Sequence, residues 1–99
     1  MPDKQLRVRW LRTALGNLDA LAHYIARDDP AAARRVVAAI QRSVTLLARY
    51  PAAGRRGRVE GTRELVVPGT PYIVPYRIRG LSVEILRVFH GARKWPPTL

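Results

Sequence analysis

Cysteine is absent from this chain of 99 residues, which excludes disulfide bonds, thiol catalysis and thiolate metal sites. Acidic residues are scarce, because 7 Asp and Glu stand against 18 Lys and Arg. No apolar run approaches the roughly 20 residues that a membrane-spanning helix needs, and residues 1–5 lead into no apolar signal core. These absences together lead us to expect a cytoplasmic protein.

The formal net charge of +11 is the first indication of function. A small protein this basic is attracted to polyanions such as nucleic acid, a ribosome or an acidic protein. Only Lys4 and Lys94 among the cationic residues are not Arg, a bias that a GC-rich genome alone would produce. Codon bias does not explain the excess of positive charge, however, so we favour a polyanionic partner.

The first half of the chain predicts a strand followed by two helices. Apolar and polar residues alternate over residues 6–10, as in a strand, and apolar residues then recur every three or four positions over residues 11–25 and 33–47. Between these helices, Asp29 is suited to cap a helix whose first residue is Pro30. The tight turn predicts an antiparallel helical hairpin.

The second half predicts a loop and three antiparallel strands. The loop covers residues 51–61, and the strands cover residues 62–67, 72–78 and 83–89. Pro75 has no N–H to donate, so it predicts an edge or bulge position. The whole chain, 1–99, is thus expected to form one α+β domain of order β-α-α-β-β-β, because its length allows a single core. The helices should cover one face of the sheet and leave the other face as the working surface.

Several segments resemble the RelE/ParE toxins of type II toxin–antitoxin systems. The resemblance is carried by residues 61–65 (Gly-Thr-Arg-Glu-Leu), 70–77, 83–90, 24–30 and the 51–57 loop. It implies a helical hairpin packed on a small curved antiparallel sheet. It also implies a cognate antitoxin that wraps the toxin and silences it.

The resemblance covers residues from about Val8 to Trp95 and offers two molecular targets. RelE-like members cut messenger RNA in the ribosome, whereas ParE-like members inhibit DNA gyrase. Residues 24–30 and 61–65 look more like the ParE, or plasmid stabilization, branch. We therefore expect a gyrase-inhibiting toxin, and the ParE branch implies that such a toxin acts by binding and not by turnover. The alternatives are a ribosome-dependent mRNA endonuclease working without a metal, and a non-toxic, basic nucleic-acid-binding module.

RNA cleavage without a metal needs a base, an acid and fixed cations. The RelE resemblance implies that Arg63, Arg87 and His90 are the matching positions. Guanidinium groups match phosphate oxygens in pairs, and the imidazole of His90 suits either proton role. Glu60 or Glu64 could supply a base.

Structural roles for the same residues compete with these. Arg87, on a strand expected to be central, could form a structural ion pair with Glu64 or Glu84, because an unpaired buried charge is costly. Strand alternation places Arg63 on the face opposite Glu64, where it could be solvated. His90 could serve as a hydrogen-bonded residue at a strand end.

Two further groups of arginines are candidate binding residues. Arg55, Arg56 and Arg58 lie among glycines, which let a backbone approach phosphate closely. We expect this group to contact RNA, gyrase-held DNA or antitoxin carboxylates, or else to form a solvated loop. Arg35, Arg42 and Arg49 repeat every seven residues and suit an acidic antitoxin tail that folds on binding, or else form a solvated helix face. The two histidines lack carboxylates at metal-ligand spacing, so we predict no metal and no cofactor.

Overall fold

The computed structural model describes residues 5–93 and residue 99, which form two helices and six strands. The elements in chain order are β1 (Arg7–Trp10), α1 (Arg12–Ala26), α2 (Pro30–Leu46), β2 (Arg55–Arg56), β3 (Arg63–Val66), β4 (Tyr72–Arg79), β5 (Ser82–Ile85) and β6 (Phe89–His90). This α+β architecture confirms the predicted fold class. No helix of the described residues is long and apolar enough to cross a membrane.

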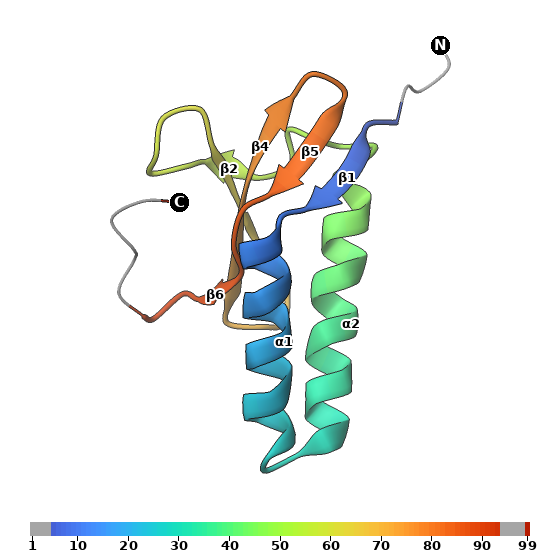
Figure 1. Cartoon of the computed structure of the whole chain (residues 1–99), viewed down its shortest axis with the longest axis vertical. Coiled ribbons are helices and arrows are strands. Elements are labelled where there is room, and N and C mark those ends of the chain that lie inside the picture. The colour runs from blue at the N-terminus through green and yellow to red at the C-terminus, as the bar shows by residue number, and fades with distance from the viewer. Residues whose placement is uncertain (1–4, 94–98) are drawn as a thin grey trace.

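The two helices form the predicted antiparallel hairpin (Figure 1). The backbone N–H of Ala32 donates to the Asp29 carboxylate at 3.0 Å, and Pro30 occupies the first turn of α2. Asp29 therefore satisfies one of the backbone donors that a helix start leaves free. The seven-residue repeat suggested that Arg49 shares a helix face with Arg35 and Arg42, but α2 ends at Leu46 and Arg49 lies in the turn that follows.

The sheet has the strand order β1-β5-β4-β3-β2, and β6 pairs with β4 off this path. β1 runs parallel to β5, whereas the other pairs are antiparallel, so the prediction of an antiparallel sheet was wrong at its first strand. The chain between this parallel pair comprises the hairpin together with β2, β3 and β4, far longer than the dozen residues that a crossover connection needs. The loop predicted for residues 51–61 also contains the short strand β2, which pairs with β3.

A bulge interrupts the strand predicted over residues 83–89. Tyr76 pairs with Ile85, but Ile73 pairs with Phe89, so three residues on one strand face two on the other. Such an extra residue breaks the regular hydrogen-bond ladder and redirects side chains locally. β5 and β6 are therefore two short strands rather than one.

Pro75 lies opposite this bulge in the interior strand β4. Its carbonyl accepts from the backbone N–H of Leu86 at 3.0 Å, and its missing N–H falls where the ladder is already broken. Across the bulge, the Val88 N–H donates to the Asn17 side chain of α1 at 3.1 Å. Of the two positions predicted for Pro75, the bulge is confirmed, whereas the edge is wrong because β4 has neighbours on both sides.

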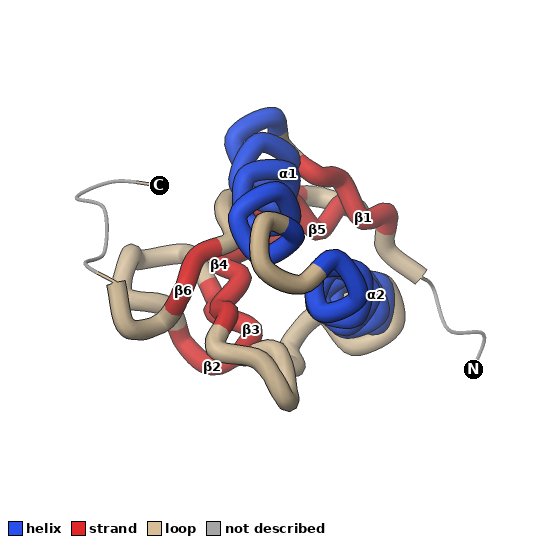
Figure 2. The backbone as a smooth tube through the Cα atoms, turned by 90° about the horizontal axis from the view of Figure 1, so that it is seen from below, coloured by secondary structure: helices blue, strands red, loops and turns tan. Residues whose placement is uncertain are grey.

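The helices cover one face of the sheet, and the main core lies between the helices and that face. Figure 2 shows the hairpin end-on, with β2, β3, β4 and β6 to one side of both helices. The core joins the apolar stripes of α1 and α2 to alternate residues of the strands, and its largest fully buried members are Tyr76, Ile40, Leu47, Ile85 and Val44. Strand alternation leaves the other residues of each strand on the face away from the helices.

Candidate functional site

The open face of the sheet, meaning the side away from the helices, is the working surface that the sequence predicts. Leu65, Val74 and Tyr76 pack into the helix-covered core. Their strand neighbours therefore project to the open face, where Glu64 and Glu84 are the buried charged residues of the described chain. Each carboxylate lies among arginines.

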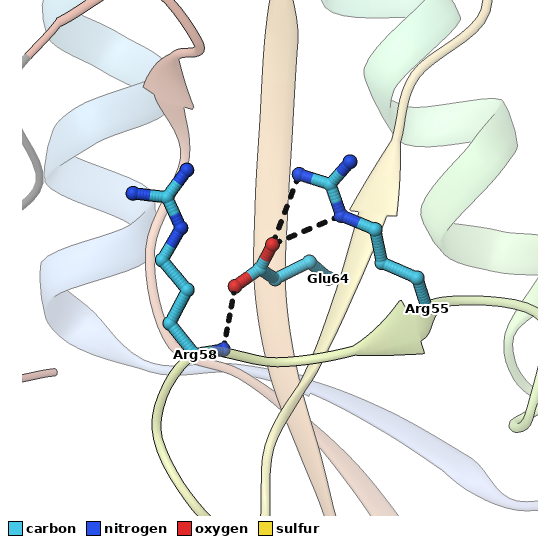
Figure 3. Close-up of polar contacts among 3 residues, drawn as sticks. All are labelled: Arg55, Arg58 and Glu64. Atoms are coloured by element: carbon cyan, nitrogen blue, oxygen red, sulfur yellow. Dashed lines mark hydrogen bonds and ion pairs between the residues drawn. The ribbon is translucent and has the colours of Figure 1, made fainter.

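Glu64 is the centre of the first cluster (Figure 3). Only 2% of its surface is exposed. Its Oε1 accepts from the Nε of Arg55 at 3.0 Å and also lies 3.0 Å from the Nη2 of that residue, while its Oε2 accepts from the backbone N–H of Arg58 at 2.9 Å. Both carboxylate oxygens are thus occupied, as a buried charge requires.

Glu84 is the centre of the second cluster. Its Oε1 accepts from the Nε of Arg77 at 2.6 Å and lies 4.0 Å from the Nε of Arg79. The hydrogen bond from Arg77 is the main cause that holds the pKa of Glu84 below its usual value, against the opposing effect of burial, and the charges of Arg77, Arg79 and Arg9 add to it. Neither carboxylate forms an ion pair with Arg87, contrary to the structural pairing considered from the sequence.

Arg63 lies on the helix-covered side, as its alternation with Glu64 predicted. Its Nη1 donates to the backbone carbonyl of Gly54 at 2.8 Å and lies 3.4 Å from that of Ala52. These bonds fix the segment between α2 and β2 to the sheet. Arg63 is thus a bound structural residue here, whereas the sequence suggested a solvated side chain or a phosphate ligand.

Tyr76 holds the same segment between α2 and β2 through its hydroxyl group. Its hydroxyl donates to the carbonyl of Pro51 at 2.7 Å and accepts from the N–H of Gly54 at 2.8 Å. A Cβ at Gly54 would lie 2.6 Å from the Tyr76 ring, so only glycine fits there. Burial raises the pKa of Tyr76 above its ordinary value, against the lowering effects of the Gly54 hydrogen bond and the Arg63 charge.

His90 is placed beside α1 rather than beside Arg63. Its Nδ1 accepts from the N–H of Ala92 at 3.1 Å, and its ring forms a T-shaped contact with that of Tyr72 at a centroid distance of 5.6 Å. Together with Tyr24 and Asn17 of α1 it lines a pocket of about 320 Å³.

The structure does not bring Arg63, Arg87 and His90 into one cluster. Arg63 pairs with Tyr76 of β4, whereas His90 pairs with Tyr72 of the same strand. These two partners are four residues apart, which separates them by roughly 13 Å along β4. Arg87 lies in the bulge, where its Nε is buried without a hydrogen-bond partner in the described residues. Their assignment as one catalytic set stays a prediction.

The other predicted binding residues are exposed. Arg55, Arg56 and Arg58 follow one another at the β2 edge of the sheet, although Arg55 is held by Glu64. The second group is Arg35 and Arg42 on α2 and Arg49 beyond it. No group of three His, Asp or Glu that could hold a metal ion occurs within residues 5–93.

Sequence reasoning missed four arginines on the open face. Arg7 and Arg9 alternate with the core residues of β1, Arg77 follows the core residue Tyr76 of β4, and Arg79 lies on the same face as Arg77. The alternation was visible in the sequence. The pairing that brings β1 and β4 to either side of β5 was not.

The fold matches those of chains from solved toxin–antitoxin systems. A chain of the chromosomal ParDE TA system from P. aeruginosa aligns with a TM-score of 0.80 and 31% identity, over 88% of this chain and 97% of that one. A chain of the RelBE2 toxin–antitoxin complex from Mycobacterium tuberculosis aligns with a TM-score of 0.62 and 29% identity, over 87% and 91%. The chain is therefore a toxin of the RelE/ParE class of type II toxin–antitoxin systems.

Sequence comparison gives the family within that class. Residues 8–95 match the model of the ParE toxin of the type II toxin–antitoxin system parDE, and the chain belongs to this family. Y4kP of Sinorhizobium fredii (strain NBRC 101917 / NGR234), whose name carries the word toxin, is 54% identical over 94% of this chain and 96% of its own length. Toxin RelE2 of Caulobacter vibrioides is 34% identical over 88% of this chain and 97% of its own length.

Proposed function

We propose that this toxin inhibits DNA gyrase by binding it, in the manner of the ParE branch, without catalysing a reaction. The observation that carries the proposal is the state of the two carboxylates on the open face. Both oxygens of Glu64 already accept hydrogen bonds, and Glu84 is buried in its ion pairs with Arg77 and Arg79. Proton transfer needs a group within reach of the reacting atom, and these carboxylates are instead committed to holding arginines in place.

The test compares both targets with the same purified, full-length chain. In one arm, gyrase supercoils a relaxed plasmid. In the other, ribosomes hold a defined mRNA. The proposal predicts that the chain blocks supercoiling and leaves the mRNA intact. Cleaved mRNA with undisturbed supercoiling would reverse the assignment.

Ribosome-dependent mRNA cleavage is the second candidate. It is favoured by the 34% identity to a protein named Toxin RelE2 and by the buried Nε of Arg87, a donor without a partner in the described residues. If cleavage occurs, His90→Ala should reduce it strongly, since His90 is the assigned acid or base. Undiminished cleavage by that variant would remove His90 from the mechanism.

We also propose that an acidic tail of the cognate antitoxin lies along α2 in the cytoplasm. The match to a ParDE system and to a RelBE2 complex supports an antitoxin partner. Arg35 and Arg42 are exposed two helical turns apart, a spacing that an amphipathic segment with carboxylates at matching intervals fits. Replacing both with Gln should weaken antitoxin binding. Unchanged affinity for the antitoxin would place that contact elsewhere.

A further inference from the structure

A quartet of arginines surrounds Glu84 and Ser82 on the open face. In the register of the sheet, Glu84 of β5 lies between Arg9 of β1 and Arg77 of β4. Ser82 of β5 lies in the same way between Arg7 of β1 and Arg79 of β4. The quartet, Arg7, Arg9, Arg77 and Arg79, thus occupies the corners of a rectangle. Its sides are roughly 7 Å along each strand and roughly 10 Å across the two strand spacings.

The rectangle carries far more positive charge than its centre neutralises. The rectangle holds four arginines and the single carboxylate of Glu84, which forms ion pairs with Arg77 and Arg79. Arg7, Arg9 and Arg79 are exposed, and 36% of the Arg77 side chain is exposed as well. Like charges this close repel one another. The fold itself gains little from this surplus, whereas a bound polyanion would offset the repulsion.

We propose that the quartet binds the phosphate backbone of DNA, without gyrase and without sequence preference. Guanidinium groups pair with phosphate oxygens, and interfaces with nucleic acid are more polar and more basic than those with protein. The polar centre of the rectangle favours DNA over an acidic protein. A protein interface would be expected to place an apolar or aromatic anchor there, and the centre holds Glu84 and Ser82 instead.

Glu84 is the positioning residue of this surface. Its carboxylate bonds Arg77 at 2.6 Å and lies 4.0 Å from Arg79, which limits where both guanidinium groups can point. Prior ordering of these long side chains reduces the entropy lost on binding. The binding function goes beyond the proposed inhibition of gyrase and does not depend on it.

The salt dependence of DNA binding tests the proposal. The full-length chain is titrated with a duplex of random sequence at several salt concentrations, in the absence of gyrase. Each phosphate neutralised adds about 0.9 to the magnitude of the slope of log affinity against log salt, so four contacts give about 3.6. Affinity should then fall roughly 150-fold between about 50 and 200 mM salt.

The double variant Arg7→Gln/Arg9→Gln should reduce the slope by about 1.8, which leaves a fall of roughly 12-fold over the same range if only the quartet contributes. Arg27→Gln/Arg34→Gln is the matched control. It removes the same charge from exposed positions near the turn that joins α1 to α2, since Arg27 caps the end of α1 and Arg34 lies near the start of α2. Figure 1 shows this turn at the end of the hairpin away from β1 and β5. The control should keep the slope of the wild-type chain. Equal losses in both double variants would overturn the proposal, because they would show that net charge alone governs binding.

A poly-glutamate peptide of equal charge serves as the alternative partner. If the Arg7→Gln/Arg9→Gln variant loses affinity for the peptide but not for the duplex, the surface serves an acidic protein and the DNA proposal is wrong. Thermal unfolding establishes that each variant folds. Should the double variant not fold, Arg79→Gln replaces it, since that side chain is 68% exposed. Its slope should fall by about 0.9, and an unchanged slope would contradict the proposal.

Discussion

Tyr76 carries one of the most constrained hydroxyl groups in the described chain. The residue is fully buried, and its hydroxyl both donates to Pro51 and accepts from Gly54. Removing the oxygen leaves a buried N–H and a carbonyl without their partner. The buried N–H of Gly54 costs about 1–3 kcal/mol when it is left unsatisfied, and the carbonyl of Pro51 adds less because that residue is only half-buried.

We therefore expect Tyr76→Phe to lower the free energy of unfolding by about 1–3 kcal/mol. Urea denaturation of the variant and the wild-type chain measures the difference. An unchanged urea midpoint would mean that the segment after α2 is not held through this hydroxyl.

Glu84 should make the stability of the chain sensitive to acid. Its pKa is lower in the folded state, chiefly because of the hydrogen bond from Arg77. A lowered carboxyl pKa contributes stability that is fully present above the unfolded pKa, near 4.5, and is lost as the pH falls through the folded value.

The free energy of unfolding should therefore fall more steeply below about pH 4.5 in the wild-type chain than in Glu84→Gln. Urea denaturation at a series of pH values measures both curves. Parallel curves would show that the Glu84 ion pairs contribute no pH-dependent stability.

At the scale of single residues, the sequence predicted which face each side chain occupies better than what the side chain does there. The opposite faces of Arg63 and Glu64 followed from strand alternation alone. Their partners did not follow, because Arg63 binds backbone carbonyls of a loop and Glu64 binds Arg55. Such contacts depend on how loops fold back onto the sheet, which residue types do not specify.

At the scale of elements, the α2 N-terminus provides a direct test of local energetics. The Asp29 carboxylate accepts from the N–H of Ala32 at 3.0 Å. Asp29→Ala should destabilise the chain by about 1 kcal/mol. Asp28→Ala is the control, since it removes the same charge one residue earlier, outside the observed cap. Equal losses of thermal stability in the two variants would attribute the effect to charge rather than to capping.

The helices were predictable because their signals are local. The apolar period and the Asp-Asp-Pro turn lie within consecutive residues, and the structure confirms the hairpin that they indicate. β2 and the break between β5 and β6 were missed, because a strand of two residues has no measurable period. The direction of β1 was missed because it depends on its distant partner β5.

At the scale of the whole molecule, the account rests on a division between two surfaces. The hairpin supplies the core and covers one side of the sheet, while the open face carries arginines held by two buried carboxylates. The family match establishes a toxin, and the arrangement of this face favours binding over proton transfer. A toxin that inhibits by binding is needed in an amount proportional to its target, whereas one molecule of an enzyme acts on many target molecules in turn.

The most direct test of this account is a titration of gyrase with the purified, full-length chain at two gyrase concentrations that differ tenfold. Supercoiling of a relaxed plasmid is the measurement. If the chain inhibits by binding tightly, the amount needed for half-inhibition should rise about tenfold with the enzyme concentration. Full supercoiling at a large molar excess of folded chain would contradict the account.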